Sequence, residues 1–328
     1  MILAGQLVII DIWDDKASGP LHTIHLGYGV GSFVVTQLME PFISSKIPSN
    51  SYLAFVSNDT NITGSSTLIV PSETLQDGFW IITALTIGIS LPWFAFSLFF
   101  KHNTNTTSKR DRDGNYRLRD LVQTLNPNSC APGHPVFVVI MYFMILIWSF
   151  VVMALERIYS KYLYSFAREQ NGFTKQEAAN ILSAYWVCMT FGRFLGFLVA
   201  KCVHVKVIIF IEGIGNFICA LGMYFLSYQN LMLWVWACLS GILIGPCHPS
   251  VIGWANRYMI VTGTGMAIMS LGPGISDITI LPVVGRLIEG FGIFTMAVVV
   301  LGLGSVSCVL PFAMQSTACT RGDRFERV

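Results

Sequence analysis

The chain has 328 residues, of which 53% are hydrophobic and only 12% are charged, and its mean hydropathy is +0.61. A soluble domain carries about 25% charged residues, so this chain has too little charge to cover its surface in water. The formal net charge of +2 is also too small to favour nucleic acid as a partner. These values exclude an ordinary soluble domain and favour a protein whose solvent is lipid.

Stretches long enough to cross a bilayer follow one another along the chain. A spanning helix needs about 20 mostly apolar residues, and backbone groups in lipid must be satisfied within the segment, which favours helices throughout. We therefore expect an all-α polytopic membrane protein with eight full transmembrane helices, preceded by a short apolar remnant at 1–12. The eight predicted spans are 19–44, 79–100, 135–160, 177–200, 205–227, 231–254, 260–287 and 291–314.

Basic residues in the connections give the orientation, because cytoplasmic loops are enriched in Lys and Arg. With the loop at 101–134 inside, thirteen Lys and Arg residues lie on the cytoplasmic side and four lie outside. The polar loop at 46–77 is then extracellular. It contains two N-glycosylation sequons, which begin at Asn58 and Asn61, and both asparagines are predicted to be glycosylated.

A short internal repeat suggests how the helices are numbered. Leu26-Gly-Tyr-Gly-Val30 matches Leu271-Gly-Pro-Gly-Ile275 at an offset of 245 residues. If this offset is one repeat of six helices, the spans are helices five to twelve, and the remnant is the end of helix four. The alternative is that glycine-rich helices resemble one another because they pack closely.

The repeat also predicts a domain organisation. The first part is the remainder of an N-terminal bundle, and a flexible cytoplasmic loop joins it to a complete six-helix bundle with a short cytoplasmic tail. The predicted boundaries of these four parts are 1–100, 101–134, 135–315 and 316–328.

Four short stretches resemble the major facilitator superfamily, and within it the branch of the sodium-dependent glucose transporter and its fucose-permease-like relatives. They are His22–Gly31, Ala154-Leu155-Glu156, Phe191–Gly196 and Pro282–Gly292. The resemblance implies a major-facilitator-type bundle without helices one to three. Two residues depart from the branch, since Asp277 is an acid at a position expected to be small or apolar, and Arg157 follows Glu156 directly.

Polar groups inside the spans are the candidate functional residues, because an ionisable side chain at the bilayer centre costs about 2.5–3.5 kcal/mol on insertion scales. His22 and His25 share one helix face and are predicted to hydrogen-bond a solute, unless they only contact water near the end of the span. The other predicted substrate-binding residues are Glu156, Tyr185, Trp186, His248 and Trp254. The aromatic ones are alternatively interface anchors.

Charged residues in the spans have both a functional and a structural interpretation. Glu156 and Asp277 are predicted to couple transport to an ion, and alternatively each pairs with a neighbouring helix. Arg193 is predicted to tie gating helices together, and Glu212 and Asn216, one helical turn apart, are predicted to be structural. Thr174 and Glu177 have the spacing of a capping box at a helix start.

The resemblance implies a secondary active transporter of a small polar solute, such as glucose or another hexose. It implies alternating access, with Na⁺ or a proton as coupling ion, and a multi-pass protein of the plasma membrane that is monomeric if complete. The alternative is a truncated, non-transporting chain with a structural or regulatory role. No zinc-peptidase, hydrolase or nucleotide-binding motif is present, and the cysteines have no metal-site spacing. We therefore expect neither an enzyme nor a metal or cofactor site.

Overall fold

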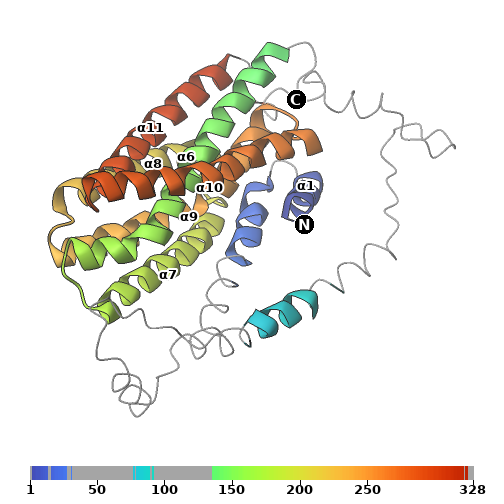
Figure 1. The fold of residues 1–328 in the computed structure, drawn as a ribbon. Coiled ribbons are helices and arrows are strands. Elements are labelled where there is room, and N and C mark those ends of the chain that lie inside the picture. Colours follow the sequence, from blue (N-terminus) through green and yellow to red (C-terminus); the bar gives the residue numbers. More distant parts are fainter. Residues whose placement is uncertain are drawn as a thin grey trace, which may run out of the picture. The chain divides into compact units, whose positions relative to one another are not determined.

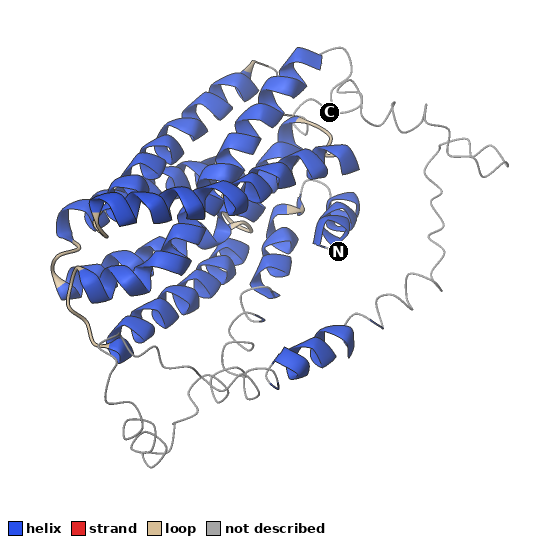
Figure 2. Cartoon of the chain, viewed as in Figure 1, coloured by secondary structure: helices blue, strands red, loops and turns tan. Residues whose placement is uncertain are grey.

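The secondary structure of the described residues is helical, and no strand occurs among them (Figure 2). The computed structural model describes residues 2–13, 16–27, 31, 77, 79–88, 91, 135–320 and 322–323. The chain divides into two compact units. Residues 1–30 and 115–328 form the larger unit, and residues 31–114 form the smaller one.

Six long helices make up most of the larger unit (Figure 1). Each is long and apolar enough to cross a membrane, which confirms the six spans predicted between residues 135 and 314. The predicted spans 19–44 and 79–100 are described only in part, so the total of eight stays a prediction. The helices of the larger unit are α1 (Ile2–Trp13), an unlabelled helix at 18–27, α6 (Pro135–Glu169), α7 (Lys175–Val199), α8 (Val205–Leu226), α9 (Asn230–Tyr258), α10 (Gly263–Phe291) and α11 (Thr295–Cys319).

Helix α6 continues nine residues beyond the predicted end of its span, from residue 160 to Glu169. Its 35 residues measure about 52 Å at 1.5 Å per residue, whereas the hydrocarbon core is about 30 Å thick. The extension stays helical because Leu163 and Phe166 are buried against the rest of the bundle. Hydropathy alone predicts only the membrane-spanning part of α6, whereas tertiary packing determines where the helix ends.

The turn between α6 and α7 has two local signals. Gly172 has a φ of +69°, a left-handed conformation that glycine adopts at little cost. Thr174 then caps α7, because its side chain accepts from the backbone N–H of Glu177 while the Glu177 carboxylate accepts from the N–H of Thr174. The predicted capping box is confirmed.

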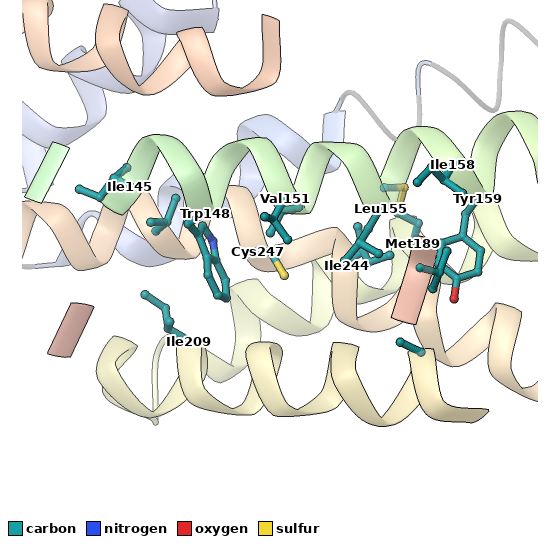
Figure 3. Close-up of a cluster of buried hydrophobic side chains, with 14 of the residues drawn as sticks. Ile145, Trp148, Val151, Leu155, Ile158, Tyr159, Met189, Ile209, Ile244 and Cys247 are labelled. Atoms are coloured by element: carbon teal, nitrogen blue, oxygen red, sulfur yellow. The ribbon is translucent and has the colours of Figure 1, made fainter. Parts of the chain in front are cut away.

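The core of the bundle forms along one side of α6. Ile145, Trp148, Val151 and Leu155 are buried on this helix, and Figure 3 shows them with Met189 from α7 and with side chains from α8 and α9. Large apolar side chains also remain exposed in number on the outer faces of the helices, among them Ile278 and Phe291 of α10, which are 76% and 80% exposed. Such a surface suits lipid and not water.

Glycines allow the closest helix contacts. A Cβ added to Gly245 of α9 would lie 2.5 Å from the Met189 carbonyl oxygen of α7, and one added to Gly272 of α10 would lie 2.6 Å from the Leu146 carbonyl oxygen of α6. Small residues of this kind let helix backbones approach one another in membranes. The helix pairs α7–α9 and α6–α10 are therefore held at distances that only glycine permits at these positions.

Of the smaller unit, the structure describes one apolar helix, Phe79–Gly88, together with three further residues. The hydroxyl groups of Thr83 and Thr86 donate to the carbonyls four residues earlier in this helix, so their polar groups are satisfied within the segment. Asn58 and Asn61 lie outside the described residues, and their glycosylation stays a prediction. The predicted domain boundaries also stay predictions.

Substituting Gly272 by Ala tests the tight contact between α6 and α10. Because the added methyl group meets a backbone carbonyl that cannot move aside alone, we expect Gly272→Ala to lower the unfolding free energy by about 1–3 kcal/mol. The control is Gly274→Ala on the same helix, where an added Cβ meets nothing within 4 Å. Unfolding of both variants in mixed detergent micelles provides the measurement. Equal stability of the two would contradict the contact.

Candidate functional site

A buried ion pair joins α6 and α7. The Arg193 guanidinium lies 3.6 Å from the Glu156 carboxylate, and the two side chains are only 5% and 6% exposed. Nε of Arg193 also donates to the carbonyl oxygen of Gly245 on α9, at 3.4 Å. Arg193 of α7 therefore contacts two other helices, α6 and α9.

Proline explains why α9 offers this carbonyl. Pro249 has no N–H to donate to the carbonyl four residues earlier, which is that of Gly245, and Arg193 occupies it instead. Pro246 likewise leaves the Ile242 carbonyl free, and Gly192 of α7 lies directly against that carbonyl. Two successive turns of α9 thus present backbone oxygens towards α7.

The predicted histidines meet at the same side of α9. The His25 ring lies edge-on to the His248 ring, with 5.0 Å between the ring centroids. The side-chain amide of Gln6 on α1 donates to Nε2 of His25 at 2.9 Å. Arg193 is close enough to interact electrostatically with both imidazoles. Residues from α1, the helix at 18–27, α7 and α9 therefore form one polar group.

His22 is fully buried and does not contact water, contrary to one of the two interpretations of the sequence. It packs where α7 and α9 meet, since a Cβ added to Gly196 would lie 2.8 Å from the His22 ring and 2.8 Å from Pro246. Neither ring nitrogen of His22 has a hydrogen-bond partner among the described residues. It is a buried imidazole with unused donor and acceptor capacity.

Aromatic side chains lie next to the ion pair. Tyr185 stacks on Tyr159 with 5.4 Å between ring centroids, and Trp186 meets Tyr185 edge-on at 5.8 Å. Ser240 donates to the Tyr159 hydroxyl at 3.0 Å, whereas the Tyr185 hydroxyl has no partner in the described part of the chain. Tyr185 is also near enough to Glu156 to interact with it electrostatically.

The structure brings together six of the seven predicted substrate-binding residues, through the contacts around Arg193 and Tyr185. The seventh, Trp254, has a different set of partners. Its indole N–H donates to Oε1 of Gln315 on α11, and its ring packs against Tyr258 at 4.9 Å. Trp254 is thus one of the buried side chains that connect α9 and α11.

Asp277 forms an ion pair with Arg157. Two hydrogen bonds of 2.5 and 3.3 Å join the guanidinium to the carboxylate, between α6 and α10. The side chains are 23% and 44% exposed, so this pair is much less buried than Glu156 and Arg193. The two residues that depart from the expected family pattern therefore compensate each other.

At the opposite end of the bundle, Asp323 accepts from Arg257 at 2.7 Å and lies 3.3 Å from Lys206. These contacts join the chain after α11 to the end of α9 and the start of α8. The charge distribution assigned all three segments to the cytoplasmic side, and the structure places them together.

Gln6 and Tyr159 belong to the polar group but were not predicted from the sequence. Gln6 is the one amide in the apolar run MILAGQLVII, and a polar residue in such a run needs a partner within the protein, so a signal was present. Tyr159 gave no signal, because tyrosine is common near the ends of spanning helices.

A bundle of apolar helices with exposed apolar faces and a buried polar group defines a multi-pass α-helical membrane protein. Residues 74–278, more than half of the chain, match the Major Facilitator Superfamily. The chain belongs to this superfamily, as the resemblance of the sequence motifs indicated.

Several curated relatives are similar over most of this chain. Sodium-dependent glucose transporter 1A of Mus musculus is 22% identical over 291 residues, which are 86% of this chain and 64% of the relative. Sodium-dependent glucose transporter 1 of Homo sapiens is also 22% identical over 86% of this chain, but over 52% of its own length. Major facilitator superfamily domain-containing protein 4A of Mus musculus is 24% identical over 43% of this chain. The chain thus spans between 46% and 64% of the length of the glucose transporters that it matches.

Solved structures have the same fold. The Major Facilitator Superfamily transporter FucP, in its outward conformation, superposes with a TM-score of 0.58 at 15% identity, covering 92% of this chain and 69% of FucP. A variant of the E. coli fucose:proton symporter FucP gives a TM-score of 0.57 at 14% identity, covering 96% of this chain and 87% of that one.

Removing Arg193 tests the buried ion pair. We expect Arg193→Met to lower the unfolding free energy by about 3–5 kcal/mol, because the Glu156 carboxylate is then buried without its counter-charge. The double variant Arg193→Met, Glu156→Met is expected to regain most of this loss. Denaturant unfolding in mixed micelles gives both values, and additive losses in the double variant would disprove the coupling.

The more exposed pair is expected to be weaker. We expect Asp277→Asn to lower the free energy of unfolding by about 1 kcal/mol or less, because partly exposed ion pairs are screened by solvent. Exchanging the two charges, in the variant Arg157→Asp, Asp277→Arg, should restore the stability that Arg157→Asp alone removes. The same unfolding assay measures these variants. A charge exchange that is no more stable than the single reversal would argue against the pairing.

Proposed function

We propose that this chain is part of a secondary active transporter that carries a small polar solute by alternating access. The observation that supports this most is the buried polar group around Arg193 and His25. A protein in lipid retains such groups where they bind a solute or an ion. The Major Facilitator Superfamily, to which the chain belongs, consists of transporters.

We propose a hexose such as glucose as the solute. His22, His25 and His248 offer imidazole nitrogens that donate to or accept from sugar hydroxyls, and Tyr185 with Trp186 offers aromatic faces for a sugar ring. Trp254 is the more distant aromatic candidate. The names of the relatives support this proposal, since they include sodium-dependent glucose transporters and a fucose:proton symporter.

The coupling ion is proposed to be Na⁺ or a proton, with Glu156 and Asp277 as the coupling residues. Each carboxylate already pairs with an arginine, so binding a cation or a proton would weaken a bond between two helices. Arg193, Glu212 and Asn216 are proposed to hold the helices together. The plasma membrane is the proposed location, and the complete protein is proposed to act as a monomer.

A second candidate function follows from length. Because the chain spans between 46% and 64% of the length of the glucose transporters that it matches, it is alternatively a non-transporting protein that pairs with other helices in a structural or regulatory role. Uptake by this chain itself, compared with uptake by the same chain extended by its own upstream coding sequence, separates the two functions.

The test is uptake of labelled glucose and fucose into proteoliposomes, with a sodium gradient, with a proton gradient and with neither. We expect the double variant His25→Ala, Glu156→Ala to reduce uptake at least about tenfold, which corresponds to 1.4 kcal/mol of lost binding. A matched control is His204→Ala, Glu289→Ala, because both residues are exposed. Uptake that is unchanged in the first variant would refute the site, and indifference to every sugar would refute the substrate.

A further inference from the structure

A second set of buried polar side chains lies between α8 and α9, which we call the α8–α9 cluster: Glu212, Asn216, Cys247 and Ser250. Ser250 donates to Oε1 of Glu212 at 2.5 Å, and the Asn216 amide lies 3.4 Å from the Cys247 sulfur. Glu212 and Asn216 are 2% and 3% exposed. The cluster connects one turn of α8 to one turn of α9.

Three other acids of this bundle form ion pairs with basic side chains. Arg193 serves Glu156, Arg157 serves Asp277, and Asp323 has two cations. The described contacts of Glu212 are instead a hydroxyl and a thiol. Burying a carboxylate without a counter-charge in an apolar helix interface is unfavourable in free energy. Without a basic partner, Glu212 can be neutralised by binding a proton.

The helices packed around Glu212 offer no cation to neutralise it. Helix α11, which approaches Gly213 through Ser307, contains no charged residue and no histidine. On α8, Lys206 pairs with Asp323, and on α9, Arg257 pairs with Asp323 while His248 faces His25. The remaining titratable side chains on these three helices are thiols and phenols, which carry no positive charge: Cys219, Tyr224, Cys238, Cys247, Tyr258, Cys308 and Cys319.

Two oxygen atoms of the cluster lack a hydrogen-bond donor among the described residues. Oε2 of Glu212 and Oδ1 of Asn216 are both buried and have no hydrogen-bond partner in the part of the chain that is described. Both are acceptors while Glu212 is ionised, so they cannot satisfy each other. The residues are four apart on α8, hence on one face of the helix. A proton on Oε2 would turn this atom into a donor, and the amide oxygen on the same helix face is an acceptor that lacks one.

We propose that the α8–α9 cluster is a proton-binding site, in which Glu212 holds a proton as a neutral carboxylic acid and Asn216 accepts its hydrogen bond. This site is separate from the polar group around Arg193. Its protonation does not depend on the proposed function, whereas its use as the coupling proton of transport does. Glu156 differs from Glu212 in having the Arg193 guanidinium as a counter-charge.

Infrared difference spectroscopy of the full chain in liposomes at neutral pH tests the protonation directly. Subtracting the spectrum of Glu212→Gln from that of the unmodified chain should reveal the loss of one carboxylic-acid C=O band, which shifts in D₂O. The matched control is Glu156→Gln, whose difference spectrum should show the loss of a carboxylate band instead. A carboxylate band in the Glu212 difference would overturn the proposal.

Two further samples make the assignment secure. Ser250→Ala removes the hydrogen bond to Oε1 and should shift the same C=O band without abolishing it, which tests the site if Glu212→Gln does not fold. Replacing choline chloride by sodium chloride should leave the band unchanged. Its conversion into a carboxylate band on adding Na⁺ would assign the cluster to a cation and overturn the proton. No solute or uptake is involved, so a failed transport assay leaves this result interpretable.

Discussion

Lipid offers no hydrogen bonds and solvates no charge, and this constraint explains most of the polar contacts in the bundle. Arg193 is held by Glu156 on one side and by the Gly245 carbonyl on the other, and Tyr159, Trp254 and Ser250 each find a partner on another helix. A polar side chain that reaches into the bundle therefore acts as a link between helices. The exceptions, such as the ring nitrogens of His22 and the hydroxyl of Tyr185, have no partner in the described part of the chain.

The helices could be predicted from the sequence because length and hydropathy are local properties. Six apolar runs between residues 135 and 314 became six helices, and the capping box at Thr174 was visible in four consecutive letters. The end of α6 could not be predicted, because Leu163 and Phe166 keep it helical through contacts with distant segments. Local pattern thus gave the existence of each element, and packing gave its limits.

The partners of the charged side chains on other helices could not be predicted from the sequence. Arg157 and Asp277 are 120 residues apart. Arg157 was noticed only as a departure from the expected pattern, and the alternative that Asp277 pairs with a neighbouring helix named no partner. Arg193 was predicted to act as a tie, but Glu156 was not known to be its partner. Sequence shows that a charge in a span needs an opposite charge, but the arrangement of the helices decides which of several candidates is near enough.

The proline at 249 has a consequence for how α9 moves. In an ordinary helix each backbone carbonyl accepts from an N–H of the same helix. In α9 the Gly245 carbonyl instead accepts from the Arg193 side chain of α7. Straightening or bending α9 therefore changes the electrostatic surroundings of Glu156 and His248 at the same time. In this molecule Arg193 links the backbone of α9 to the Glu156 carboxylate, so the shape of this helix and the charge beside that carboxylate are connected.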